Sequence, residues 1–430
     1  MRKKISYCCL AITLFVAALQ PLTGMAQPVI SGVSPLAGYP SASVTITGAG
    51  FNTTPANNIV YFGATKATVS SASATSLTVS RPAGATYAPV SVLNTGTQFN
   101  GFSLSSFLPT YDNSPYIANA VNFSAASSLA TTISGNTAAI GDIDGDGKPD
   151  MVVVNYTGST ATVFRNISSS GALTSGSFAS GVDFTICTNP SGVAIADMDR
   201  DGKPDLVFAG FNGNGVFVLR NTSTSGSISS SSFATVVGFS SAMTEFDVAV
   251  GDIDGDGKLD IVASSSISNN ISVFRNTSST GVINSSSFAT HVDFATPNAP
   301  RSVVVSDMDG DGKSDIVVAN FSNNSVSVFR NVATSGSFTT SSLSTRVDFT
   351  ASAAPYRVVT CDIDGDGKPE IITANYSSNN ISILRNTATS GSITTSSFAS
   401  QVTFGGGNAV EGIAIADFDG DGKPDIATGN

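Results

Sequence analysis

One acidic decapeptide recurs six times along this chain at a fixed interval of 55 residues. The copies read GDIDGDGKPD, ADMDRDGKPD, GDIDGDGKLD, SDMDGDGKSD, CDIDGDGKPE and ADFDGDGKPD. Their first aspartates are Asp142, Asp197, Asp252, Asp307, Asp362 and Asp417. A period of this length is typical of repeat proteins, in which one supersecondary unit cannot bury its core alone and stacks on its neighbours. The sequence therefore predicts a repeat architecture with six visible units.

The residues around each decapeptide predict four short strands per repeat. In the first repeat, TAAIGD leads into the acidic loop, DMVVVNY leaves it, ATVFRN follows a short turn, and FASGVDF comes last. Other copies place Asn-Asn or Gly-Asn in the short turn, which is a hairpin signal. Four antiparallel strands per unit are typical of a propeller blade. We therefore expect an all-β chain with a β-propeller of four-stranded blades, six or seven in number, the last one incomplete.

The decapeptide itself predicts a calcium site. Carboxylates occupy positions 1, 3, 5 and 9 of each loop, position 6 is always glycine, and the position 7 lysine would offer its backbone carbonyl with its side chain in solvent. Alternating hard oxygen ligands on a tight loop suit calcium better than magnesium, which prefers a stiffer octahedral shell. With one ion per repeat, the predicted ligands are Asp142, Asp144, Asp146, Lys148 and Asp150; Asp197, Asp199, Asp201, Lys203 and Asp205; Asp252, Asp254, Asp256, Lys258 and Asp260; Asp307, Asp309, Asp311, Lys313 and Asp315; Asp362, Asp364, Asp366, Lys368 and Glu370; Asp417, Asp419, Asp421, Lys423 and Asp425.

These loops also account for the acidity of the chain. They hold 24 of its 31 aspartates and glutamates, and the formal net charge is −11. Four carboxylates packed in one loop repel one another without a cation, so we interpret the acidity as a set of metal sites. The same acidity argues against nucleic acid as a partner.

The first residues have the features of an export signal. Arg2, Lys3 and Lys4 precede a short apolar run, and small residues up to Ala26 offer a cleavage site before Gln27. The alternative is a membrane anchor, but the run is too short to span a bilayer, and no later segment is apolar enough. We expect residues 1–26 to be removed and the mature chain to be secreted or held at the cell surface.

Two parts of the chain resemble known families. The pattern DxDGDGxxD between hydrophobic strands, with Phe404-Gly405 in the last complete unit, resembles the FG-GAP/VCBS-type repeats of integrin-like propellers over residues 117–430. That resemblance implies calcium in the loop between the first two strands of each blade, and ligand on the opposite face. Residues 27–97, with Ser34-Pro35, Gly48 and Phe62-Gly63, resemble an IPT/TIG immunoglobulin-like domain, which implies a β-sandwich acting as a spacer or adhesion module. We expect residues 98–116 to be a linker.

The end of the chain departs from the repeat. After the sixth loop the sequence reads DIATGN and stops, where other copies continue to an Arg-Asn pair. We expect the natural product to continue with a segment like SSNNISILRNT, and residues 118–123 to supply the fourth strand that closes the ring. The Arg-Asn pairs at Arg165, Arg220, Arg275, Arg330 and Arg385 recur so regularly that we expect a structural role between blades.

Positions that break the repeat are the candidates for ligand binding. The loops between blades vary most, and on the face away from the acidic loops they would bring together Arg301, Tyr356, Arg357, Glu411, Glu245 and Asp247. An arginine beside a tyrosine suits an acidic sugar, and the alternative is a variable solvated rim. For the recurrent aromatics Tyr156, Phe211, Phe321 and Tyr376 we expect packing between blades rather than sugar stacking.

The sequence gives little support for catalysis. His291 is the one histidine of the chain, so a Ser-His-Asp or Cys-His site is hard to assemble. The free thiols of the mature chain, Cys187 and Cys361, are not expected to pair. We therefore predict a non-catalytic, calcium-stabilised adhesion or ligand-binding protein for extracellular glycan or a surface protein. The alternatives are a polysaccharide lyase or hydrolase, and a structural spacer of a larger surface protein; the oligomeric state is left open.

Overall fold

The computed structural model describes residues 27–110, 135–169, 174–241 and 244–430. The expected export signal and the expected closing strand at 118–123 both lie outside these residues. The described chain is built from strands, with three single-turn 3₁₀ segments, Pro55–Asn57, Ser175–Ser177 and Phe321–Asn323. None of its helices is long and apolar enough to cross a membrane.

The N-terminal part is a β-sandwich made of one sheet that folds over on itself. Its strands are β1 (Val29–Ser34), β2 (Ala37–Gly38), β3 (Ser43–Ala49), β4 (Asn58–Phe62), β5 (Thr65–Ala72), β6 (Ser76–Ser80), β7 (Ala88–Asn94) and β8 (Phe99–Pro109), in the order β1-β3-β6-β5-β4-β7-β8-β2. Alternate residues of these strands point inward, so that Val44, Ile46 and Leu77 pack against Phe62 and Phe107. The last two rings meet edge to face at 4.8 Å.

The expectation of a linker at residues 98–116 is wrong for most of that stretch. Residues 99–109 form β8, which pairs with β7 and places Phe107 in the sandwich core. The sequence FNGFSLSSFLP is rich in glycine and serine, which hid its alternating pattern. A serine on a strand satisfies its backbone in the sheet ladder, so composition alone does not mark a linker here. Residues 111–116 lie outside the described residues.

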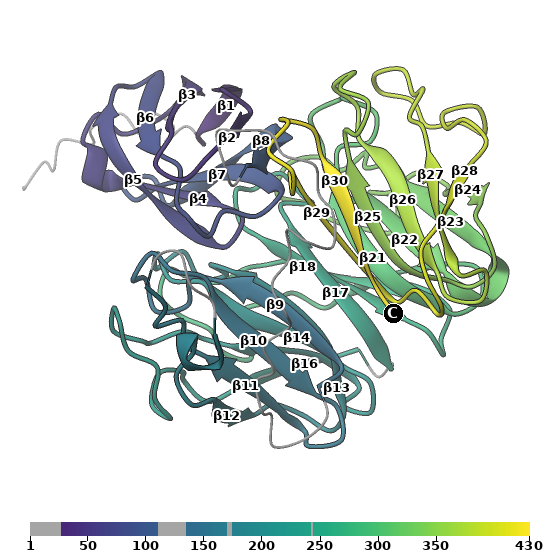
Figure 1. The fold of residues 1–430 in the computed structure, drawn as a ribbon, viewed down its shortest axis with the longest axis horizontal. Helices are drawn as coiled ribbons and strands as arrows, with labels where there is room; N and C mark the ends of the chain where they lie inside the picture. Colours follow the sequence, from purple (N-terminus) through teal and green to yellow (C-terminus); the bar gives the residue numbers. More distant parts are fainter. Residues whose placement is uncertain (1–26, 111–134, 170–173, 242–243) are drawn as a thin grey trace, which may run out of the picture.

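The repeats form successive four-stranded sheets, as predicted for propeller blades (Figure 1). The blades are β9–β12 (Thr137–Gly141, Asp150–Asn155, Thr160–Phe164, Val182–Thr185), β13–β16 (Pro190–Ala196, Asp205–Gly210, Gly215–Leu219, Val237–Ser240), β17–β20 (Glu245–Gly251, Asp260–Ser265, Asn270–Phe274, Val292–Ala295), β21–β24 (Pro300–Ser306, Asp315–Asn320, Ser325–Phe329, Val347–Thr350) and β25–β28 (Pro355–Cys361, Glu370–Asn375, Asn380–Leu384, Val402–Gly405). A sixth, two-stranded sheet holds β29 (Gly412–Ala416) and β30 (Asp425–Gly429). The first strand of each sheet lies beside the first strand of the next, so the inner strands follow one another around a common axis.

Adjacent blades share their hydrophobic cores. Residues of the first and second blades fall in one buried cluster, and Phe184 of the first meets Phe233 of the second edge to face at 4.8 Å. The same contact joins Phe239 to Phe288 at 4.7 Å and Phe349 to Phe398 at 4.8 Å. A single four-stranded sheet would leave these faces in water, which is why the unit must be repeated to fold.

The asparagine of each Arg-Asn pair joins one blade to the previous one. Asn221 Nδ2 donates to Ile143 O at 2.7 Å, and Asn276, Asn331 and Asn386 make the same bond one, two and three blades later. This matches the structural role expected for the pair. Because each acceptor is a backbone carbonyl of the preceding acidic loop, the bond also fixes the loop relative to the next blade.

Candidate functional site

Each acidic loop connects an inner strand to the second strand of its blade and is folded around its own carboxylates. In the first loop, Asp142 Oδ2 accepts the Gly147 N–H at 3.0 Å, Asp144 Oδ1 accepts the Asp146 N–H at 3.1 Å, and Asp146 Oδ1 accepts the Lys148 N–H at 3.0 Å. Gly147 turns through φ +87°, a conformation that residues with a Cβ adopt at a cost. The glycine at position 6 is therefore explained by the turn.

The carboxylate at position 9 anchors the loop to the rest of the blade. Asp150 Oδ2 accepts the Ile143 N–H at 3.0 Å, and its Oδ1 accepts the Asn166 N–H at 2.8 Å. Glu370, the longer residue at this position in the fifth loop, makes the equivalent pair of bonds with Ile363 and Asn386. Position 9 thus ties the loop to the segment that follows the third strand.

The loops fit a hard divalent cation. Oxygens of Asp142, Asp144 and Asp146 lie within 4.8 Å of one another, and comparable groups occur in the other loops. Asp142 Oδ1 is buried without a hydrogen-bond partner among the described residues. A buried, unpartnered anionic oxygen is costly unless a cation or proton satisfies it. Carboxylate oxygens at this density are the ligands that calcium prefers.

Burial and nearby charges raise the pKa of some of the loop carboxyls in the metal-free chain. Desolvation, with the nearby charges of Asp144 and Asp146, raises the pKa of Asp142 to about 6. Burial likewise raises the pKa of Asp150 to about 7 and that of Asp197 to about 7. The folded loop therefore holds ionised carboxylates at neutral pH only at a cost in free energy, which a bound cation would offset.

Arginine also neutralises the loops, which the sequence interpretation missed. Arg165 donates from Nε to Asp144 Oδ2 at 2.5 Å and from Nη2 to Asp146 Oδ2 at 2.8 Å. The next three blades repeat this fork through Arg220, Arg275 and Arg330, always to positions 3 and 5 of their own loop. Arginine therefore supplies positive charge to these loops in addition to any bound metal ion. The signal was available, since the arginine follows position 3 by the same interval in the first five copies.

In four of the six loops the lysine at position 7 does not extend into solvent as expected, whereas the Lys423 side chain of the sixth loop is 79% exposed. Lys148 Nζ donates to Ser168 O at 2.9 Å, and Lys203 Nζ donates to Ser223 O at 2.8 Å. Lys313 and Lys368 make the same bond in the fourth and fifth loops. The side chain therefore fastens the loop to the segment after the third strand, and only the backbone carbonyl of position 7 is left for a metal.

The sandwich sits directly on the face that carries the acidic loops (Figure 1). The Asp142 N–H donates to Ala64 O at 3.1 Å, the Tyr61 hydroxyl donates to Gly202 O at 2.8 Å, and the Asn100 N–H donates to Gly257 O at 3.1 Å. The Asp362 N–H donates to the Tyr87 hydroxyl at 3.2 Å, and a β-bridge pairs Thr110 with Asp417. Loops 1, 2, 3, 5 and 6 therefore all contact the sandwich.

Arg200 distinguishes the second loop from the other five. Five copies have glycine at position 4, and the second has Arg200, which is 7% exposed and adopts φ 60°. Its Nη1 donates to Gln98 O at 2.7 Å, in the sandwich, and its Nη2 donates to Ser278 O at 2.9 Å. A left-handed arginine is uncommon and is kept where surrounding contacts hold it. The break in the repeat marked this domain contact in the sequence, but its meaning needed the structure.

The opposite face of the propeller carries a cluster of aromatic side chains around Arg301. The Arg301 Cζ atom lies 4.1 Å from the ring centroid of Phe321, 4.8 Å from that of Tyr356 and 5.0 Å from that of Phe246. The ring centroids of neighbouring aromatics lie about 6 Å apart from Tyr156 through Phe211 to Phe246, and on to Tyr356 and Tyr376. Much of this cluster lines a cavity of about 430 Å³. We call it the aromatic cluster below.

The structure places the other candidate ligand residues in different ways. Arg357 Nη1 pairs with Asp247 Oδ2 at 3.1 Å, and Asp247 is itself buried, so it positions the arginine. Glu411 is exposed. Burial and the negative charge of Glu411 raise the pKa of Tyr356, whereas the positive charge of Arg301 lowers it. Glu245 is 0% exposed, and burial raises its pKa, so it lies behind this surface and does not line it.

The aromatic residues of this face differ in part from what the sequence predicts. The recurrent aromatics do touch across blades, as expected for packing, but Tyr156, Phe211 and Phe321 also line the cavity and are half-buried. Phe246, which was not among the candidates, completes the contact with Arg301 because it stands at the same repeat position as Tyr356.

The histidine and the thiols lie apart from the aromatic cluster. His291 Nδ1 is 2.8 Å from Asp293 Oδ1, beside an outer strand, and its ring packs on Phe274. Cys187 and Cys361 are both free thiols, as expected, and burial raises the pKa of each to about 12. These residues give no activated nucleophile among the described residues.

Comparisons with known proteins agree with the repeat and the sandwich. A family model for the FG-GAP-like repeat matches residues 142–208, 197–263, 252–318, 307–373 and 362–428, and one for the IPT/TIG domain matches residues 28–111. No curated protein matches the chain.

Several solved structures are similar at low identity. An auxiliary nutrient binding protein from Bacteroides thetaiotaomicron is 11% identical, with 94% of this chain and 98% of that chain covered and a TM-score of 0.39. A functionally unknown protein from Desulfotomaculum acetoxidans is 12% identical, with 70% and 92% covered and a TM-score of 0.44. An Agrocybe aegerita lectin that recognises non-reducing terminal N-acetylglucosamine is 15% identical, with 94% and 99% covered and a TM-score of 0.41. The repeat model covers more than half of the chain, and the chain therefore belongs to the FG-GAP-like repeat family, with an IPT/TIG domain ahead of its repeats.

Proposed function

We propose that this chain is an exported, calcium-stabilised binding protein that holds an acidic extracellular glycan on the propeller face opposite the acidic loops. The observation that carries the proposal is the aromatic cluster around Arg301, at the axis of the propeller. It combines flat apolar surfaces with a fixed cation, which is the pair of features that a sugar carrying a carboxylate needs.

The aromatic rings supply the stacking surface. Tyr156, Phe211 and Phe321 are half-buried, so each keeps part of its ring open to the cavity. A sugar ring has an apolar face of C–H groups that can lie on such a surface, where burial of apolar area is favourable. A cavity of about 430 Å³ has room for one or two sugar units by the scale of ordinary ligand sites, about 300–1,000 Å³.

Arg301 supplies the charge. Its guanidinium faces are occupied by aromatic rings, which stabilises the cation and fixes its plane. Its Nε is buried and has no hydrogen-bond partner among the described residues. A planar donor set held this way suits a carboxylate, which accepts two parallel hydrogen bonds from arginine.

Calcium in the acidic loops would hold the platform together. The ligands would come from positions 1, 3, 5 and 9 and the carbonyl of position 7, and each loop joins two strands of one blade while its backbone accepts a bond from the next. A site with free calcium at 100 times its dissociation constant gains about 2.7 kcal/mol in the native state. The ions are thus proposed as structural cross-links in a chain without disulfides among its described residues.

The test is retention of labelled acidic and neutral polysaccharides by the calcium-loaded mature chain, with product length measured on the same samples. We expect acidic chains to be retained at unchanged length, and Arg301→Ala to weaken retention at least tenfold. His291→Ala, outside the aromatic cluster, is the control and should bind as the parent does. Shortened chains would replace the proposal with a lyase or hydrolase. Absence of retention would point to a protein partner or a spacer.

A further inference from the structure

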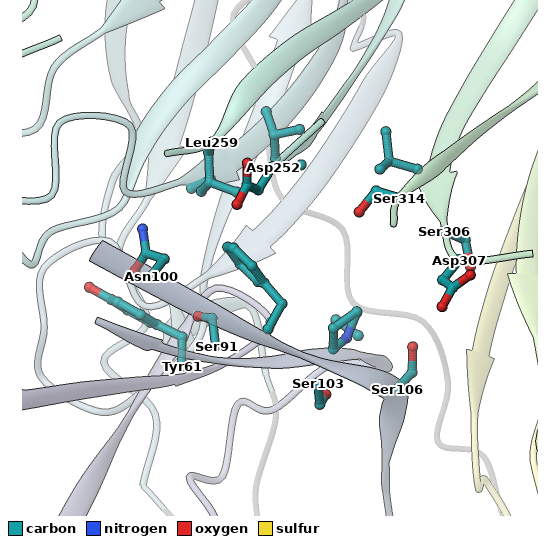
Figure 2. A pocket seen from close by; sticks show the side chains of 18 of the residues that line it. Tyr61, Ser91, Asn100, Ser103, Ser106, Asp252, Leu259, Ser306, Asp307 and Ser314 are labelled. Atoms are coloured by element: carbon teal, nitrogen blue, oxygen red, sulfur yellow. The ribbon is translucent and has the colours of Figure 1, made fainter. Parts of the chain in front are cut away.

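A second and larger cavity lies where the sandwich meets the propeller. Its volume is about 1140 Å³, and it is lined by the sandwich on one side and by all six inner strands on the other. Figure 2 shows Ser91, Asn100 and Ser103 of the sandwich facing Asp252 and Leu259 of the propeller. None of the residues of the aromatic cluster lines this space, so it is a separate site.

The propeller wall of the cavity contains a ring of five aliphatic side chains and one threonine. The ring is formed by one repeat position, two residues before the first aspartate of each loop. That position holds Ile140, Ile195, Val250, Val305, Thr360 and Ile415, and all six line the cavity. Ile140 is 53% exposed, and the other five are partly exposed. Ile195, Val250 and Val305 also pack in part against the hydrophobic cores of the blades, and the surface they leave exposed faces the cavity around the axis.

The sandwich wall also presents apolar side chains to the cavity, beside its polar ones. Leu104 of β8 is 63% exposed and faces the cavity with Phe102. Apolar side chains that remain exposed on both walls of one enclosed space are costly in water, because each leaves hydrocarbon surface hydrated. The space is therefore suited to hydrocarbon.

The rim of the cavity is closed on several sides and polar on one. Hydrogen bonds or a β-bridge join the sandwich to loops 1, 2, 3, 5 and 6. At the fourth loop, Ser306, Asp307 and Ser314 lie across the cavity from Ser103 and Ser106 of β8 (Figure 2). This side offers the hydroxyl groups of Ser306 and Ser314 next to an apolar interior, while Asp307 is a predicted calcium ligand of the fourth loop.

We propose that this cavity binds a single-chain amphiphile, with its hydrocarbon tail inside the aliphatic ring and its polar head at the fourth loop. The volume of about 1140 Å³ lies just above the range of ordinary ligand sites, about 300–1,000 Å³, so a lipid-sized molecule fits. The inference goes beyond the glycan proposal, because it uses different residues on the other face.

The test is a fluorescence titration of the calcium-loaded full chain with cis-parinaric acid, a fatty acid whose emission rises in apolar surroundings. We expect a saturable rise with one probe per chain. Leu104→Glu places a charge in the apolar wall and should weaken binding at least tenfold. The matched control is Val402→Glu, since Val402 is 58% exposed but does not line the cavity. It should bind as the parent does.

A second variant guards against a folding defect in Leu104→Glu. Val250→Trp adds bulk inside the ring and should lower probe affinity while the melting temperature and glycan retention stay at parental values. No saturable rise with the parent chain would overturn the proposal. Parental binding by both Leu104→Glu and Val250→Trp, or equal loss in Val402→Glu, would also overturn it, because the probe would then be on another surface.

Discussion

The two faces of the propeller follow opposite rules. On the acidic-loop face the same residue types recur every 55 residues, and each makes the same bond in blade after blade, as Asn221 and Asn276 do. On the opposite face one aligned position holds Ser191, Phe246, Arg301, Tyr356 and Glu411. Repetition marks what every blade needs to fold, and variation marks what a single, non-repeating ligand would contact. Arg200 fits the same contrast, because this residue breaks the pattern of the loops and contacts the sandwich, which does not repeat.

The largest test of this contrast is removal of metal. Chelation should lower the melting temperature by more than about 10 °C, since loss of about 2.7 kcal/mol per site would shift a domain of this size by several degrees for each site. Thermal unfolding with chelator, and again after calcium is restored, measures it. An unchanged melting temperature would mean that calcium does not stabilise the acidic-loop face. Full recovery with magnesium would mean that the stabilising ion is not specifically calcium.

The second test is the pH dependence of the metal-free chain. Burial raises the pKa of Asp142 to about 6 and those of Asp150 and Asp315 to about 7, from an ordinary value of 3.8. The folded state then binds more protons than the unfolded state between these values, so stability must fall as pH rises from about 4 to about 7. We expect the chelated chain to melt at a higher temperature at about pH 5 than at about pH 8. With calcium the trend should reverse, because protons compete with the ion. Parallel curves with and without calcium would contradict this.

The third test compares two equivalent asparagines. Asn331 donates both within its blade, to Ser314 O, and across to Ile253 O of the previous blade. Asn166, in the first blade, donates to Pro149 O of its own blade. Asn331→Ala should cost about 1–3 kcal/mol of unfolding free energy, because it removes the side-chain donor to a buried carbonyl of another blade, and Asn166→Ala should cost less. Denaturant unfolding of the two variants decides it; equal losses would mean that the bond between blades contributes little.

The smallest expected effect lies on the other face. Phe321→Ala removes the ring closest to Arg301 and should weaken acidic glycan binding by about tenfold, since a partly exposed cation–π contact is worth about 1–2 kcal/mol. The control is Phe404→Ala, because Phe404 is an exposed aromatic outside the aromatic cluster. Affinity measurements should separate the two variants. If both weaken binding alike, the aromatic cluster is not the site.

Much of the fold could be predicted from the sequence because the patterns that specify it lie within single repeats. The run of β-branched residues in DMVVVNY and the turn residues after it predicted a hairpin, and the decapeptide predicted its loop. The prediction failed at β8, where glycine and serine disguised a strand as a linker, and at Arg165, whose loop partners were not inferred. Glu245 was placed on the surface because a charged residue is usually exposed, but the fold buries it.

The sequence by itself determined the acidic loops, because their bonds join residues two to seven positions apart and form whenever the glycine turn does, as between Asp142 and Gly147. Only the tertiary structure decided what the loops contact. Gln27 meets Asp252 across 225 residues, and Arg357 meets Asp247 across 110. Such contacts depend on how blades and sandwich pack, which is a balance of apolar burial over the whole surface and leaves no local pattern to read. The aromatic cluster and the aliphatic ring both belong to this second class.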